Sequence, residues 1–215
     1  MMPTGRPARV AVWDPLVRVA HWALVAAFAV AYLSAEEEGA DAPALLHVWG
    51  GYAVGIIVAL RIVWGFVGPG RARFSDFVRG PGTVLREVID LVRGRAARHL
   101  GHGPAGGAMI VALLVCLAAT VATGLVAFGD RGKGPLAHAA SVIAMPADAA
   151  AARAEGDAQR EGNRTESVLG ELHGTIANIT LALIILHILG VIVTSFAHRE
   201  NLVAAMITGE KRAED

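Results

Sequence analysis

Four long apolar stretches dominate this sequence of 215 residues, in which 54% of the side chains are hydrophobic. A helix that crosses a membrane needs ~20 mostly apolar residues, and each stretch is about that long. The sequence therefore predicts an all-α integral membrane protein, a four-helix bundle that forms a single domain over residues 1–215. We expect the first stretch to remain as a helix, because no small-residue cleavage motif follows its basic start. The predicted spans are residues 16–34, 47–67, 106–128 and 172–197.

Lysines and arginines outside the spans lie mostly on one side of this predicted topology. The loop 68–105 carries seven arginines and both chain ends add more, whereas the loop 35–46 carries none and the loop 129–171 carries five basic residues. Basic residues are retained on the cytoplasmic side of a membrane. Both termini are therefore predicted to be cytoplasmic, and the loops 35–46 and 129–171 to face outward.

The two longest connections suggest different roles. The loop 129–171 is rich in alanine and mixed in charge, so it can form a surface helix or stay partly mobile. Its function can be to dock an outside partner, or it can be a plain solvated loop. Residues 76–101 predict an amphipathic helix at the membrane surface, with an apolar face that includes Val84, Leu85, Val88 and Ile89 and with arginines around it.

Charge and cysteine content exclude several classes of protein. The formal net charge is zero, which gives no indication of a nucleic-acid partner. The chain has one cysteine, Cys116, so an internal disulfide framework and a multi-cysteine metal site are both excluded. Because Cys116 lies within an apolar run, it is interpreted as a small hydrophobic residue and not as a reactive thiol.

Four of the eight histidines lie within or at the edge of a predicted span. His173 and His187 are fourteen residues apart, which places them on nearly the same helix face and ~21 Å apart along the axis. His47 begins the second span at the level of His173. His21 lies near the start of the first span, and its depth matches that of His187 within ~7 Å, a difference that helix tilt can absorb. The other histidines are in loops or at a helix end: His99, His102, His138 and His198.

Two histidine pairs at two depths predict two metal centres, with His21, His47, His173 and His187 as the iron ligands of two haems. Imidazole suits iron, and a helical bundle can enclose a planar macrocycle. Zinc needs about four ligands at one height, and none of the spans supplies them. A proton relay needs Asp or Glu within the spans, where none occurs. Taken singly, each histidine is also explained as a hydrogen-bonded interior residue, and that alternative stays open.

Arg61 is a cation within the second span and needs an anionic partner. It lies fourteen residues after His47, at the depth of the cytoplasmic layer, where a haem propionate can accept its hydrogen bonds. Snorkelling to the cytoplasmic headgroups explains it equally well, because the span ends six residues later. Gly50, Gly51 and Gly55 beside His47 leave room either for a flat ring or for a closely packed helix.

The histidine segments resemble the prokaryotic cytochrome b561 family, which is grouped with the cytochrome b subunits of nickel–iron hydrogenases. The resemblance implies a bacterial inner-membrane cytochrome with two haems b that exchanges electrons with quinone. It also implies that His21 and His187 hold the cytoplasmic-side haem and that His47 and His173 hold the periplasmic-side one. The loops 68–105 and 129–171 are longer than in the shortest members. The segments that carry the resemblance are residues 12–22, 47–78, 101–115 and 172–209.

The leading functional hypothesis is transmembrane electron transfer between the quinone pool and a periplasmic redox partner, with no catalytic residue assigned. The alternatives are a superoxide:quinone oxidoreductase, a membrane anchor subunit of a hydrogenase-type complex, and a haem-free scaffold or transporter subunit. Superoxide oxidation needs a cationic path, which only the basic residues of loop 129–171 can supply. Quinone contacts are expected at His198, Arg199 and Asn201, which also fit an ordinary polar helix end meeting headgroups.

Overall fold

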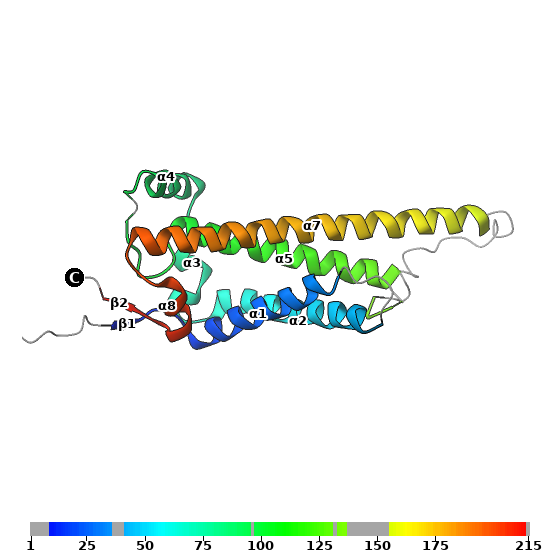
Figure 1. The fold of residues 1–215 in the computed structure, drawn as a ribbon, viewed down its shortest axis with the longest axis horizontal. Helices are drawn as coiled ribbons and strands as arrows, with labels where there is room; N and C mark the ends of the chain where they lie inside the picture. The colour runs from blue at the N-terminus through cyan, green and yellow to red at the C-terminus, as the bar shows by residue number, and fades with distance from the viewer. Residues whose placement is uncertain (1–8, 36–40, 96, 131–132, 137–154, 214–215) are drawn as a thin grey trace, which may run out of the picture. The chain divides into compact units, whose positions relative to one another are not determined.

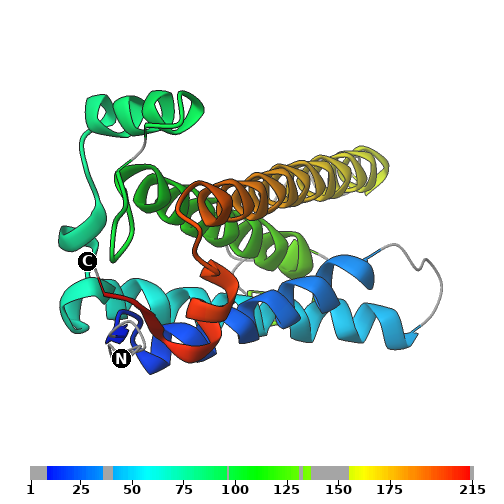
Figure 2. The ribbon, with the colours of Figure 1, turned by 60° about the vertical axis from the view of Figure 1, so that its left-hand side comes forward.

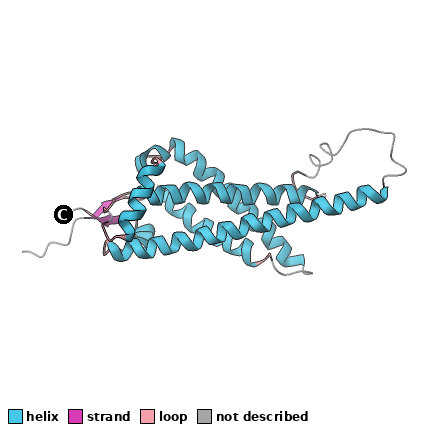
Figure 3. Ribbon diagram, turned by 90° about the horizontal axis from the view of Figure 1, so that it is seen from above, coloured by secondary structure: helices cyan, strands magenta, loops and turns pink. Residues whose placement is uncertain are grey.

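The computed structural model describes residues 9–35, 41–95, 97–130, 133–136 and 155–213, and for residues 41–44, 130 and 155–167 it describes the backbone alone. Helices make up most of this part of the chain (Figure 3). In order along the chain, the elements are β1 (Arg9–Ala11), α1 (Pro15–Leu33), α2 (Asp41–Val67), the 3-10 helix η1 (Gly70–Ala72), α3 (Phe74–Phe77), α4 (Pro81–Val92), α5 (Pro104–Asp130), α7 (Glu155–Ala197), α8 (Leu202–Thr208) and β2 (Glu210–Arg212).

Among the described residues, four helices are long and apolar enough to cross a membrane, which confirms the predicted all-α membrane fold. Their apolar segments run over residues 15–33, 45–67, 104–129 and 168–197, within a few residues of the predicted spans. Helix α7 begins at Glu155, so the last part of the predicted loop 129–171 is helical, which is one of the two alternatives that its sequence left open. Residues 131–132 and 137–154 of that loop, with His138 and the basic Arg131 and Arg153, lie outside the described residues, as do the acidic residues 36–38.

Helix ends in the chain are set by capping residues. Asp14 precedes α1 and its carboxylate accepts hydrogen bonds from the backbone N–H groups of Leu16 and Val17, while Pro15 occupies the first helical position. Asn201 caps α8 in the same way, accepting from Ala204 N at 2.8 Å. Gly209 ends α8 with a φ of 86°, a left-handed conformation that a side chain rarely adopts.

The chain folds as two compact units, residues 1–114 with 182–215 and residues 115–181. In the first unit, α1 packs along α2 (Figures 1 and 2). A Cβ atom built on Gly50 would lie 3.0 Å from Ala31 Cβ, so the glycine lets the two helices approach closely. At Gly51 the corresponding position is open. Of the two explanations offered for these glycines, close helix packing therefore holds at Gly50.

Two short strands, which the sequence analysis did not predict, join the two ends of the described chain in the first unit. β1 and β2 pair antiparallel, with Arg9 opposite Arg212 and Ala11 opposite Glu210 (Figure 1). The carbonyl of Gly209 extends the contact by accepting from Val12 N and Trp13 N at 2.8 and 3.1 Å. The strands are three residues long and pair across almost the whole sequence, so no local sequence pattern predicts them.

The second unit contains the later part of α5 and the earlier part of α7. The hydroxyl groups of Thr120 and Thr180 lie 3.1 Å apart and join these two segments. Thr180 is fully buried, and its hydroxyl also donates to Ile176 O, so its polar atom is satisfied. Interhelical contacts of this kind stabilise apolar helices that have no hydrophobic driving force in lipid.

Candidate functional site

His21 on α1 and His187 on α7 face each other within the first unit. Their ring centroids are 6.5 Å apart, with 56° between the ring planes. With metal–nitrogen bonds of ~2 Å, two imidazoles on opposite sides of one metal ion have centroids ~6 Å apart. The Nδ1 atom of His21 is buried and has no hydrogen-bond partner among the described residues. The spacing of the two rings fits a metal held between them, whereas no described residue orients the His21 ring through its Nδ1 atom.

His47 on α2 is oriented by a neighbouring helix. Its Nδ1 atom donates to the carbonyl of Ala31 at 2.8 Å. A proton on Nδ1 leaves Nε2 as the atom with the lone pair, and ligating histidines are oriented by this kind of bond. The site of His47 is thus compatible with metal ligation through Nε2.

His173 on α7, in the second unit, has the same kind of support. Its Nδ1 atom donates to the carbonyl of Thr120 at 3.0 Å and lies 3.3 Å from the hydroxyl of Thr123. Gly124 leaves space for the ring, since a Cβ atom there would lie 2.9 Å from His173 Cε1. The protein therefore holds this imidazole in one tautomer and one orientation.

Arg61 on α2 is buried, with 8% of its surface exposed, so its side chain does not extend into solvent. The guanidinium lies over the ring of Phe74, 5.4 Å from the centroid. Its Nη1 atom is shielded from solvent and lacks a hydrogen-bond partner in the described part of the chain. A buried guanidinium with an unpaired N–H group can still donate a hydrogen bond to an anion.

His102 is a residue that the sequence analysis set aside as a loop histidine. It lies just before α5, between the ring of Trp13 at 4.3 Å and that of Phe77 at 5.1 Å. Burial, followed by the charges of Arg61, Lys211 and His187, lowers its pKa to about 3, so the ring is neutral at neutral pH. Helical periodicity could not have indicated this position, because His102 precedes the helix and its neighbours come from distant segments.

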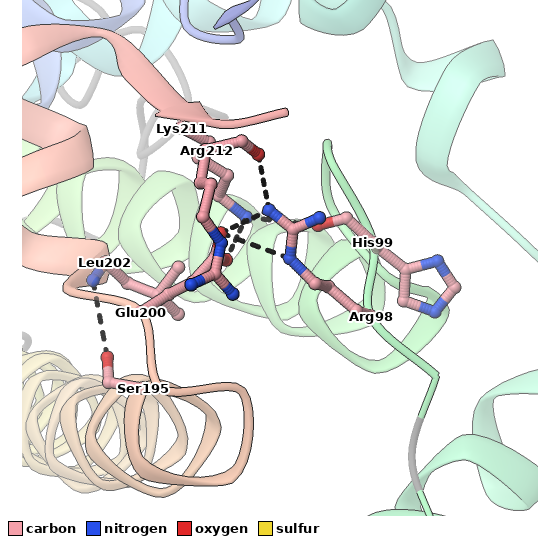
Figure 4. A network of polar contacts seen from close by, with 7 residues as sticks. All are labelled: Arg98, His99, Ser195, Glu200, Leu202, Lys211 and Arg212. Atoms are coloured by element: carbon pink, nitrogen blue, oxygen red, sulfur yellow. Dashed lines mark hydrogen bonds and ion pairs between the residues drawn. The ribbon is translucent and has the colours of Figure 1, made fainter. Parts of the chain in front are cut away.

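A polar network connects the C-terminal segment to the loop before α5, all within the first unit (Figure 4). Arg98 donates two hydrogen bonds to Glu200 Oε1, at 3.1 and 2.5 Å, and one to the carbonyl of Arg212. Lys211 Nζ donates to His99 O at 3.1 Å and lies 3.7 Å from Glu200 Oε2. Burial raises the pKa of Glu200, but the Arg98 hydrogen bond and the surrounding positive charges outweigh it and lower that pKa. Burial also lowers the pKa of Lys211.

The residues expected to contact quinone form the turn between α7 and α8. Asn201 caps α8, and Arg199 adopts a φ of 50° in the turn itself. These roles account for Asn201 and Arg199 without a ligand. Helix α8 lies beside the start of α1 (Figure 2). Side chains of these two helices line a shallow, mainly apolar groove, and Arg18 donates there to Ile207 O. The groove is lined by Arg18, Val19, Trp22, Ala23, Met206 and Ile207.

Comparison with protein families gives a match that covers most of the chain. The model described as prokaryotic cytochrome b561 matches residues 12–209. This range includes all four span histidines, Arg61 and His102. Comparisons with curated proteins and with solved structures gave no match.

Proposed function

Because the chain belongs to the prokaryotic cytochrome b561 family, whose members carry electrons within membranes on haem b, we propose that it uses two such haems to move electrons between the quinone pool and a periplasmic redox partner. The observation that carries the proposal is the pair of imidazoles of His21 and His187, 6.5 Å apart. Each haem supplies one-electron chemistry when bound. The chain's part is to hold, orient and shield it.

His21 and His187 are proposed to hold the haem nearer the chain termini. If both histidines held the iron, the haem would supply electron transfer and not oxygen chemistry. Trp22 lies edge-on to His21, with centroids 5.2 Å apart, and restrains that ring.

His47 and His173 are proposed to hold the second haem. Support comes from the spacing of His173 and His187 along α7, which separates the two layers by ~21 Å. The hydrogen bonds from Nδ1 of His47 to Ala31 O and of His173 to Thr120 O favour Nε2 as the ligating atom in both rings.

Quinone is proposed to exchange electrons at the apolar groove of α1 and α8. The groove includes Trp22, which contacts the ring of His21, and apart from Arg18 its other walls are apolar side chains that suit an isoprenoid molecule. Filling it with Ala23→Trp should slow reduction of the protein by quinol and leave the haem spectrum unchanged. Val30→Trp, on an exposed part of α1 away from the groove, is the matched control. Equal quinol rates in the two variants would exclude this location.

The main test is a reduced-minus-oxidised spectrum of the purified protein together with haem quantification. We expect a low-spin b-type spectrum and about two haems per chain, because each histidine pair would hold one haem iron. A preparation that binds no haem, or binds only one when its folding is intact, contradicts the two-haem proposal.

A further inference from the structure

A small cavity in the first unit has two buried nitrogen donors in its wall. It is lined by Arg61 from α2 and by His102 from the segment before α5. Residues just before α1 and in its first turn also form part of the wall. Arg61 Nη1 and His102 Nδ1 are both shielded from solvent, and neither has a hydrogen-bond partner among the residues described. Native proteins rarely leave two such donors beside one cavity without a partner. The remaining lining residues are Val12, Trp13, Asp14, Val17, Arg71 and Ala72.

The other polar groups of the cavity already have partners. The carboxylate of Asp14 accepts from Leu16 N and Val17 N at the start of α1, at 2.9 and 3.2 Å. Arg71 Nη1 donates to the carbonyl of Ala11 at 2.8 Å. Arg61 and His102 are therefore the two lining residues with an unsatisfied buried nitrogen.

The chemistry of the two donors indicates a carboxylate. A guanidinium presents parallel N–H groups that match the two oxygens of a carboxylate, and the neutral His102 ring can add one N–H donor. Arg61 and Arg71 both bring positive charge to the cavity, and Asp14 is its one acidic lining residue. The local balance of charge therefore favours an anion.

The cavity lies close to the His21 and His187 pair. Arg61 is six residues from the end of α2 and His21 is six residues from the start of the neighbouring α1, so both lie ~9 Å inside their helix ends. Val17, which lines the cavity, lies four residues before His21, about one turn earlier on α1.

We propose that Arg61 and His102 together bind one propionate carboxylate of the haem that His21 and His187 hold. This inference rests on the proposed function, and it assigns His102 a cofactor-positioning role that its loop position gave no reason to expect. Arg61 supplies the charge and the guanidinium donors, while His102 supplies a single neutral donor fixed between Trp13 and Phe77.

Redox-induced infrared difference spectra of the full-length holoprotein test this directly, with haem labelled by ¹³C at its propionate carboxyl carbons. Arg61→Gln and His102→Leu should each shift the labelled carboxylate bands, because the carboxylate loses a hydrogen-bond donor. Transfer of haem to an excess of a haem-scavenging apoprotein should become ~10- to 100-fold faster for about half of the bound haem, the range expected on losing a hydrogen bond to a charged group.

Matched controls remove the same side-chain types at positions away from the cavity. Arg79→Gln removes a guanidinium whose bonds go to Ser75, Asp76 and Val78 carbonyls, and His99→Gln removes an imidazole paired with Glu87. Both should keep the wild-type carboxylate bands and haem-transfer rates. His102→Asn, which keeps an N–H donor close to the position of Nδ1, should restore much of what His102→Leu loses.

Two results would overturn the inference. The first is that the labelled carboxylate bands are the same in the wild type, Arg61→Gln and His102→Leu. An equal shift of these bands in the control variants would have the same meaning. If Arg61→Gln does not fold, Arg61→Lys and the two His102 variants give the same comparison. The other is a wild-type protein without any low-spin haem, which would overturn the proposed function as well and is recognised by its visible spectrum.

Discussion

The ring of His173 lies so close to Gly124 that a Cβ atom on the glycine would be 2.9 Å from His173 Cε1. Real Cβ atoms are essentially never found that near another heavy atom, so a side chain at position 124 must displace the imidazole. The contact lies within the second unit and links the orientation of a proposed haem ligand to the absence of a side chain on the facing helix.

Gly124→Val should therefore remove one haem and leave the other in place. We expect haem content to fall from about two per chain to about one, because a displaced His173 imidazole would no longer hold the haem. Gly170→Val is the matched control, since a Cβ atom at Gly170 meets nothing within 4 Å. Full haem content and an unchanged spectrum in Gly124→Val would contradict ligation by His173.

Replacing His21 and His187 should show that the two residues act as one unit. His21→Ala and His187→Ala should each remove about one haem per chain, and the double variant should lose no more than either single one, because both residues serve the same iron. Haem quantification and the low-spin spectrum measure this. His99→Ala, on the surface beside Glu87, should keep the full haem content. Additive losses from the two single variants would exclude a shared site.

Glu200→Gln should weaken the contacts between the C-terminal segment and the loop before α5. The side chain of Glu200 is 9% exposed and accepts two bonds from Arg98, so the loss of its charge should cost about 1–3 kcal/mol at pH 7. Thermal unfolding of the purified protein measures this. Glu210→Gln is the control, because its pair with Arg9 is exposed at 3.7 Å and contributes little.

The lowered pKa of Glu200 predicts how the stability of the protein changes in acid. The folded protein lowers the pKa of Glu200 below the ordinary value of 4.5, since the bonds and charges of Arg98, Lys211 and Arg212 outweigh the effect of burial. The folded state therefore binds this proton less well than the unfolded chain. The stabilisation is complete above pH 4.5 and is lost as the pH falls through the lowered value. The Glu200→Gln variant should not show this loss of stability below pH 4.5. If its stability depends on pH as that of the wild type does, the role of Glu200 is contradicted.

Both chain ends should be found in the cytoplasm. The pairing of β1 with β2 requires the two ends of the described chain to lie on the same side of the membrane, and the distribution of basic residues indicates which side that is. Fusions of a periplasm-dependent phosphatase to either terminus should be inactive, whereas cytoplasmic fluorescent fusions should be bright. An active phosphatase fused to either terminus would show that the orientation is opposite to the predicted one.

Helix α4 should lie in the membrane surface. None of its residues is buried, and Leu85 and Val92 are 61% and 84% exposed. A spin label at Leu85→Cys, in a Cys116→Ser background, should be relaxed more strongly by oxygen than by a water-soluble nickel complex, because an apolar face of this kind inserts into lipid. A label at Asp90→Cys should show the opposite preference. Equal exposure of both labels to the nickel complex would place α4 in water.

Much of the fold could be predicted because it depends on local properties. Length and apolar composition determine whether a segment can cross a membrane, and all four predicted spans are found within a few residues of their expected positions. The relation of His173 to His187 is equally local, since helix geometry sets the direction of two side chains on one helix. The early start of α7 at Glu155 was left open, because its alanine-rich, mixed-charge sequence fits either a helix or a loop.

The four membrane helices and the relative positions of the histidines on α7 could be predicted without the structure, because helix periodicity and hydrophobic length act over neighbouring residues. Tertiary structure alone decided that His21 faces His187, that β1 pairs with β2, and that His102 joins Arg61 at one cavity. Each of these depends on side chains that are distant in the chain and become neighbours only when the helices pack. The physical reason is that packing and the pairing of buried polar groups are properties of contacts between elements, and no single segment contains both partners.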